Sequence, residues 1–198
     1  MTLERLPSRL PGVRYGAMTR FADDRGAFVE VWRAGAFGAI AEADAGAPTG
    51  ASPAFVQANL SFSAPGVLRG LHLHRRQLDY WFVAAGRAFV ALVDVRPMLA
   101  GGPAPTVETR ELQADDWVTI PAGVAHGFLA LEALQLHYLV TTEYDGSDES
   151  GFAWDDPSAG IAWPPVRSIP GGRPILSERD RSNPSLAELV ARLRDPGS

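Results

Sequence analysis

Residues 67–96, VLRGLHLHRRQLDYWFVAAGRAFVALVDVR, decide the fold. Two runs rich in β-branched and aromatic residues flank a short polar turn, which is typical of neighbouring β-strands. His72 and His74 precede the turn and are two residues apart, so both side chains point to the same face of an extended strand. Gly70 could seat a β-bulge, which would let Arg69 turn toward the same side. The stretch therefore predicts a strand that presents histidines to a pocket.

Short runs of the same kind recur along the rest of the chain. We expect strands within residues 12–19, 28–32, 54–63, 68–74, 82–84, 88–95, 107–112, 117–120 and 134–142. About nine or ten short strands with turn signals every eight to twelve residues predict an all-β sandwich or barrel in a single domain, residues 1–198.

The remaining segments predict helices, loops and one extended piece. Residues 33–47 are expected to form a short helix, residues 97–105 a loop, and residues 145–164 an irregular segment anchored by Trp154 and Trp163. ILSERD, residues 175–180, is expected to be extended and to end in Asp180. The chain closes with a helix capped by Asn183 or Ser185, whose apolar stripe is made of Leu186, Leu189, Val190 and Leu193.

Composition excludes several classes of function. The chain has 198 residues, a net charge of −5 and no cysteine, so thiolate metal sites and thiol nucleophiles are impossible. The sequence has no stripe of basic residues, so we do not expect it to bind nucleic acid. No apolar run reaches membrane-spanning length, and the first residues lack the apolar core of a signal peptide. We therefore expect a cytoplasmic protein without nucleic-acid or membrane partners.

Polar side chains on two further strands mark a possible site. Gln57 and Asn59 share one face of their strand, where they are either at the surface or hydrogen-bonded in a site. On the strand within residues 134–142, alternation places Tyr138 on the face opposite to His137. We expect His137 to point outward or to be merely hydrogen-bonded.

Two spacings resemble the motifs of the cupin superfamily. They are His72-x-His74-x4-Asp79-x6-Gly86 and Pro121-x-Gly123-x2-His126, although Asp79 stands where the motif usually has glutamate and Ala130 where it has asparagine. The resemblance implies a double-stranded β-helix, the cupin or jelly-roll barrel, here with a C-terminal helix. It also implies one alternative for function: a metal-dependent oxygenase or isomerase with the ligands His72, His74, Asp79 and His126.

A more extensive resemblance covers the chain from about residue 21 to residue 180. The segments FADDRGAFVEVW, QANLS, GVLRGLH, IPAGVAHGF, the Tyr138 strand, WDDPSAGIAWP and ILSERD are similar, in the same order, to dTDP-4-dehydrorhamnose 3,5-epimerases. This family implies a cofactor-free homodimer that epimerises a dTDP-4-keto-6-deoxyhexose by proton removal and return next to the ketone.

The resemblance implies roles residue by residue. His72 falls on the base, Asp180 on its orienting carboxylate and Tyr138 on the acid at the opposite face of the sugar. The nucleotide-sugar is expected to contact Gln57, Asn59, Arg69, His74, His126 and two thymine-stacking aromatics, Phe21 and Tyr144. Arg25, Phe28 and Glu30 match a strand that family members exchange across a dimer, and a solvated edge is the alternative for Arg25 and Glu30.

One position departs from the family. Asp79 aligns with a lysine that stabilises the developing enolate, and a carboxylate would repel that charge. His74, which replaces a glutamine of the family, or Arg69 could take over this task. Alternatively the reaction has changed, for example to that of sugar 3,4-ketoisomerases, or the scaffold binds a nucleotide-sugar without turnover.

Overall fold

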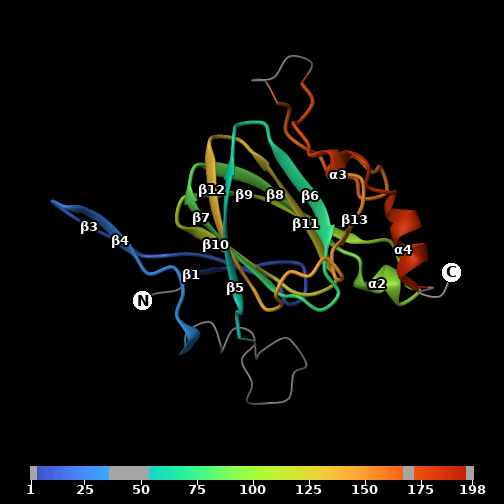
Figure 1. Cartoon of the computed structure of the whole chain (residues 1–198), viewed down its shortest axis with the longest axis horizontal. Helices are drawn as coiled ribbons and strands as arrows, with labels where there is room; N and C mark the ends of the chain where they lie inside the picture. Colours follow the sequence, from blue (N-terminus) through green and yellow to red (C-terminus); the bar gives the residue numbers. More distant parts are fainter. Residues whose placement is uncertain (1–3, 36–53, 167–171, 195–198) are drawn as a thin grey trace.

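Two antiparallel sheets that face each other make up the body of the molecule (Figure 1). The computed structural model describes residues 4–35, 54–166 and 172–194. The six-stranded sheet has the order β1 (Glu4–Leu6), β2 (Arg14–Ala17), β10 (Asp116–Ile120), β7 (Asp79–Ala85), β12 (Leu134–Val140), β5 (Gln57–Ser63). The five-stranded sheet has the order β13 (Ser150–Gly151), β6 (Leu68–Leu73), β11 (Val124–Ala130), β8 (Arg87–Asp94), β9 (Thr106–Gln113). The predicted all-β jelly-roll barrel is confirmed.

The core lies between the sheets, and strand β7 shows how the sequence divides its two faces. Trp81 and Val83 pack in the inner cluster together with Phe128 of β11. The alternating residues Tyr80 and Phe82 point outward and pack in a second cluster. Because both faces of β7 are covered by apolar groups, the strand is a continuous hydrophobic run rather than a strict alternation.

The C-terminal helix α4 (Leu186–Arg194) covers the outer face of the five-stranded sheet (Figure 1). Its predicted apolar stripe is confirmed, since Leu186, Leu189 and Val190 are buried in a cluster with residues of β6 and β8. The backbone N–H of Glu188 donates to Ser185 Oγ and the backbone N–H of Ser185 donates to Glu188 Oε2, which is a capping box. Of the two predicted caps, Ser185 is therefore the one used.

The predicted bulge in strand β6 is present at Gly70. On β11 two steps separate His126 from Phe128, whereas their partners on β6, His72 and Arg69, are three steps apart. The extra residue places both Arg69 and His72 on the pocket side. Gly70 has φ +120°, and a Cβ atom there would lie 2.6 Å from the Cα of Gly127, so only glycine fits.

Three expectations for local structure are wrong. The expected loop at residues 97–105 begins with a short helix, α2 (Arg96–Leu99), because Pro97 suits a first helical turn. The expected extended segment 175–180 ends in another short helix, α3 (Glu178–Arg181), because Ser177 Oγ caps it by accepting from the N–H of Asp180. The expected strand 28–32 stops at Val29, and the Tyr80 hydroxyl instead donates to the carbonyl of Val31.

Two other expectations concern the segments around these elements. Most of the expected helix 33–47 falls outside the described residues, which omit 36–53. The anchoring role of the two tryptophans is confirmed. Trp163 Nε1 donates to the carbonyl of Trp154 over 2.9 Å, and both rings pack against a buried cluster that contains Leu68 of β6 and Leu129 of β11. In the described ranges, no helix combines the length and apolar character needed to span a membrane.

The bulge generates a stability prediction. Gly70→Ala should lower the free energy of unfolding by roughly 1–3 kcal/mol from backbone strain alone, with the clash against Gly127 adding to this loss. Gly35→Ala is the control, because nothing lies within 4 Å of a Cβ there, and it should stay within about 0.5 kcal/mol of the wild type. Equal urea midpoints for the two variants would contradict the account.

Candidate active site

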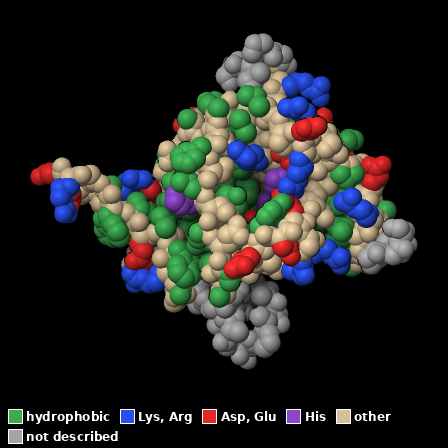
Figure 2. All heavy atoms as spheres, in the orientation of Figure 1, with side chains coloured by type: hydrophobic (Ala, Val, Ile, Leu, Met, Phe, Trp, Pro, Cys, Tyr) green, Lys and Arg blue, Asp and Glu red, His purple; other side chains and the backbone are tan. Residues whose placement is uncertain are grey.

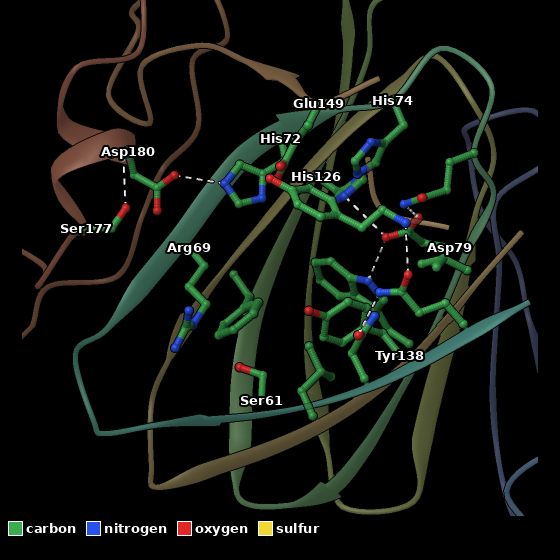
Figure 3. Close-up of a pocket in the computed structure, with 18 of the residues that line it drawn as sticks. Ser61, Arg69, His72, His74, Asp79, His126, Tyr138, Glu149, Ser177 and Asp180 are labelled. Carbon is green, nitrogen blue, oxygen red and sulfur yellow. Dashed lines mark hydrogen bonds and ion pairs between the residues drawn. The ribbon is translucent and has the colours of Figure 1, made fainter. Parts of the chain in front are cut away.

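A pocket of about 450 Å³ opens between the two sheets (Figure 3). Basic side chains and a histidine surround a hollow near the centre of the face shown in Figure 2. Its lining comes from both sheets and from the C-terminal segment: Gln57, Asn59, Ser61, Arg69, His72, His74, Gln77, Asp79, Trp81, His126, Phe128, Leu136, Tyr138, Val140, Tyr144, Glu149, Ser177, Arg179 and Asp180. Nine of the thirteen residues predicted to act in catalysis or binding are thus brought to one cavity.

His72 and Asp180 form a hydrogen-bonded pair at one side of the pocket (Figure 3). His72 Nε2 lies 2.8 Å from Asp180 Oδ1, with side-chain exposures of 23% and 5%. An ionised carboxylate can only accept, so Nε2 carries a hydrogen, and in the neutral imidazole the lone pair is then on Nδ1. Burial raises the pKa of Asp180, but the hydrogen bond and charge of His72 outweigh burial and lower it below its usual value. Asp180 is therefore ionised, and its carboxylate holds the hydrogen of His72 on Nε2.

Tyr138 lies on β12, in the sheet opposite to the one that carries His72. Its neighbours Leu136 and Val140 share its face, as alternation predicts, and also line the pocket, whereas His137 on the opposite face is exposed. Burial raises the pKa of the Tyr138 phenol, and the charge of Asp79 raises it further. The phenol consequently stays protonated at physiological pH and can donate a proton.

His74, Asp79 and His126 form a second polar group deeper in the pocket (Figure 3). One nitrogen from each imidazole and one oxygen of Asp79 all lie within 4.8 Å of one another. Asp79 accepts from Gln77 Nε2 over 2.6 Å and from Trp81 Nε1 over 3.3 Å. Burial lowers the pKa of His126 to about 4, so its imidazole is neutral at physiological pH.

The positions of these three side chains can be compared with the four metal ligands expected from the cupin motifs. Two imidazoles and a carboxylate suit a first-row transition metal, so His74, Asp79 and His126 fit such an ion. His72 does not belong to this group, because only the donor atoms of the other three residues lie within 4.8 Å of one another. The four-residue set expected from the cupin motifs is therefore reduced to three residues.

The amide and arginine side chains expected to bind substrate are fixed by hydrogen bonds. Gln57 Nε2 donates to Asn59 Oδ1 over 2.9 Å, and the backbone N–H of Tyr144 donates to Gln57 Oε1 over 2.9 Å. Arg69 Nε donates to Ser63 Oγ over 3.1 Å. These contacts leave Tyr144, which is 67% exposed, at the mouth of the pocket.

Sequence reasoning missed an ion pair beside the catalytic candidates. Arg179 Nη1 lies 2.7 Å from Glu149 Oε1, and the Glu149 side chain is 16% exposed. Burial raises the pKa of Glu149, but the hydrogen bond and charge of Arg179, together with His72 and Tyr144, outweigh burial and lower the pKa overall. The signal was available for Arg179, which directly precedes Asp180 in the motif ILSERD, but Glu149 lies in a segment without any periodic pattern.

Four predicted binding residues lie away from the pocket of their own chain. Phe21, Arg25 and Phe28 belong to the hairpin β3 (Arg20–Asp23) and β4 (Gly26–Val29), and Glu30 follows it. The hairpin projects away from the body (Figures 1 and 2). Phe21 and Phe28 are cross-strand partners and are 55% and 65% exposed. Arg25 pairs with Asp23, and Glu30 pairs with Arg33.

Comparisons with known proteins all indicate the same family. A family model described as dTDP-4-dehydrorhamnose 3,5-epimerase matches residues 7–188. The chain is 37% identical over 180 residues to a dTDP-4-dehydrorhamnose 3,5-epimerase of Sinorhizobium fredii. The aligned region covers 86% of this chain and 83% of that relative.

Solved structures give the same result. A dTDP-6-deoxy-D-glucose-3,5-epimerase of Legionella pneumophila, in complex with dTDP-4-keto-L-rhamnose, matches with a TM-score of 0.80 and 28% identity over 97% of both chains. A 3'-monoepimerase of Streptomyces bikiniensis, in complex with dTDP-quinovose, matches with a TM-score of 0.78 and 29% identity over 94% of this chain and 89% of that one.

Proposed function

Because the chain belongs to the dTDP-4-dehydrorhamnose 3,5-epimerase family, we propose that it is an isomerase that epimerises a dTDP-4-keto-6-deoxyhexose in deoxysugar biosynthesis. The observation that carries the proposal is the placement of His72 with Asp180 on one sheet side of the pocket and Tyr138 on the opposite sheet. Inversion of a carbon needs a base and an acid on opposite faces of the sugar, and this arrangement supplies both.

The first step is proton removal from a carbon next to the ketone. His72 Nδ1 has the free lone pair and takes the proton, which leaves a positively charged imidazolium. Asp180 already holds Nε2–H over 2.8 Å, so its negative charge stabilises the imidazolium as it forms. The electron pair of the broken C–H bond moves onto the ketone oxygen as an enolate.

The second step is return of a proton from the other side. Tyr138 keeps its proton because burial and Asp79 raise its pKa. Donation from the phenol to the carbon re-forms the ketone with inverted configuration. The matched structures include a 3,5-epimerase and a 3'-monoepimerase, so inversion at one carbon or at two is open to the same pair of groups.

The nucleotide is proposed to lie toward the mouth of the pocket. Arg69 carries a positive charge on the pocket side of β6 and suits the diphosphate. Tyr144 offers an exposed ring on which thymine can stack. Gln57 and Asn59 lie between them on β5 and can hydrogen-bond the sugar. A substrate activated by a nucleotide diphosphate is a product of intracellular metabolism, and we propose that the enzyme acts in the cytoplasm.

We also propose that two copies form a homodimer through the β3–β4 hairpin. Phe21 and Phe28 are too exposed for a free surface hairpin of four-residue strands. Leu60 and Phe62 on the edge strand β5 are also exposed, at 45% and 63%. Packing against a second copy would cover such surfaces and would carry Phe21, Arg25, Phe28 and Glu30 to the partner's pocket.

The reaction itself is tested by isotope exchange. Wild-type protein in deuterium oxide should incorporate deuterium at C3, at C5 or at both carbons of dTDP-4-keto-6-deoxyglucose, measured by mass spectrometry and NMR. A known 3,5-epimerase under the same conditions is the positive control. No incorporation by this protein, while the control exchanges, would rule out the proposed function.

Two variants test the assigned roles. Asp180→Asn should lower kcat on the order of a hundredfold with little change in KM, because the carboxylate matters most after proton transfer. Tyr138→Phe should slow net inversion more than isotope exchange, because His72 still removes the proton. Asp155→Asn, which changes a half-exposed carboxylate paired with Arg173, is the control and should remain fully active. Near-wild-type inversion by both test variants would show that these residues are assigned wrongly.

The dimer is tested by light scattering. The wild type should elute with the mass of two chains, and Phe28→Asp should shift it toward one chain and raise KM. Glu111→Ala, an exposed change on β9 of the other sheet, should alter neither value. A wild type that is monomeric at the concentration of the activity assay would contradict the dimer.

A further inference from the structure

We propose that His74, Asp79 and His126 bind a protonated amino group of the sugar, so that the preferred substrate is an amino-substituted dTDP-4-keto-6-deoxyhexose. One ring nitrogen of each imidazole and one carboxylate oxygen of Asp79 lie within 4.8 Å of one another in the pocket (Figure 3). We call these three side chains the acceptor group. The inference rests on the proposed function for the rest of the substrate and adds the chemical class that the acceptor group selects.

Both imidazoles of the acceptor group present a lone pair. His74 Nδ1 lies 2.9 Å from the carbonyl oxygen of Asp148, and His126 Nδ1 lies 3.1 Å from that of Val124. A carbonyl oxygen only accepts, so each Nδ1 carries a hydrogen, and in the neutral imidazole the lone pair is then on Nε2. Each ring can therefore accept a hydrogen bond from a ligand without giving up its contact with the backbone.

Asp79 supplies the third acceptor and a negative charge. Its side chain is 5% exposed, and Oδ2 lies 3.5 Å from His126 Nε2. Gln77 Nε2 and Trp81 Nε1 donate to the carboxylate, which uses two of its roughly four lone-pair positions. The carboxylate therefore retains acceptor capacity and, because it lines the pocket, can offer it to a ligand.

Among the described residues, no arginine of the pocket lining pairs with Asp79. The lining contains two arginines: Arg69 donates to Ser63, and Arg179 pairs with Glu149. The chain contains no lysine, since all 18 of its Lys and Arg residues are arginines. A buried carboxylate without a cationic partner is costly. A ligand that brings a positive charge to this place should therefore bind more tightly than a neutral ligand of the same shape.

The number and spacing of the acceptors suit an ammonium group. Such a group has three N–H donors and no acceptor. Three atoms within 4.8 Å of one another can all lie about 2.9 Å from a single nitrogen, which is an ordinary hydrogen-bond distance. A hydroxyl group in the same place has only one hydrogen to donate, so it would leave two acceptors unpaired and the charge of Asp79 unbalanced.

The chemistry of the sugar places the amino group at C3. The ketone carbon C4 has two neighbours, and C5 already carries the methyl group and the ring oxygen, so C3 is the neighbour that can carry nitrogen. The charge of Asp79 raises the pKa of the Tyr138 phenol, so the acceptor group borders the space in which that phenol is proposed to act. We therefore expect a substituent next to the ketone to reach the acceptor group.

A bound ammonium would also change the electrostatics of the reaction. Asp79 alone would oppose the negative charge that develops on the ketone oxygen. An ammonium group at C3 is next to the ketone, so it would balance Asp79 and attract the enolate oxygen at the same time. The substrate itself would then supply the positive charge that stabilises the enolate.

Binding of two stable nucleotide-sugars tests the proposal. dTDP-6-deoxyglucose has a hydroxyl group at C3, and dTDP-3-amino-3,6-dideoxyglucose differs from it only at that carbon. Calorimetry with the wild type at neutral pH should give a Kd at least tenfold lower for the amino compound. EDTA is present so that no divalent cation occupies the three side chains. Equal Kd values, or tighter binding of the hydroxyl compound, would overturn the proposal.

Two variants assign the preference to the acceptor group. Asp79→Asn removes the charge and should abolish the preference, while unchanged binding of the hydroxyl compound shows that the variant is folded. His74→Leu removes one acceptor and should reduce the preference severalfold, which keeps the test decisive if Asp79→Asn does not fold. His137→Asn changes an exposed histidine of β12 and is the control, with the full preference. A full preference in Asp79→Asn or in His74→Leu would overturn the proposal.

Isotope exchange separates this proposal from the proposed function. dTDP-4-keto-6-deoxyglucose should exchange with solvent deuterium, and its 3-amino analogue should exchange with a kcat/KM at least tenfold higher. Equal exchange of the two ketones, together with equal binding, would leave the epimerase standing and overturn the amino-group site. Preferential binding of the amino compound without exchange of either ketone would leave the site standing and the proposed function wrong.

Discussion

The hydrogen bond between His72 and Asp180 is the interaction on which the site depends. It joins residues 108 positions apart, one on a barrel strand and one in the short helix α3. Ser177 caps that helix and so places the carboxylate. The barrel alone would leave the imidazole free to adopt either tautomer. The C-terminal segment, held to the outer face by Leu186 and Leu189, therefore does more than cover the sheet, because it decides which nitrogen is basic.

The two-sheet architecture supplies the second requirement. The proposed base on β6 and the phenol on β12 belong to different sheets, so a sugar bound between them would be contacted on two faces without either group having to move. The bulge at Gly70 turns Arg69 toward the same space, so the arginine proposed to bind the diphosphate and the histidine proposed as base lie on one strand. Two carboxylates of this pocket are held by basic side chains, Asp180 by His72 and Glu149 by Arg179.

Local periodicity predicted the features that depend on a single strand, such as which face a side chain occupies. It failed for features that depend on contacts between distant segments. Alternation alone placed Tyr138 and His137 on opposite faces of their strand, and Gly70 alone suggested the bulge. The pairing of His72 with Asp180 came from resemblance, because no pattern within either segment links them. The helix that holds Asp180 was missed because its serine cap was not recognised. Glu149 was missed because its segment has no periodicity, and its position depends on a direct ion pair with Arg179 from a distant part of the sequence.

The central claim is that Asp180 selects the tautomer of His72 in which Nε2 carries the hydrogen and Nδ1 is basic. Nitrogen NMR of ¹⁵N-histidine-labelled protein near neutral pH tests this directly, with His72 assigned by its substitution. The account predicts a protonated, pyrrole-type signal for Nε2 and an unprotonated, pyridine-type signal for Nδ1, with this difference reduced toward an average in Asp180→Asn. The reverse assignment, or averaged signals in the wild type, would contradict it.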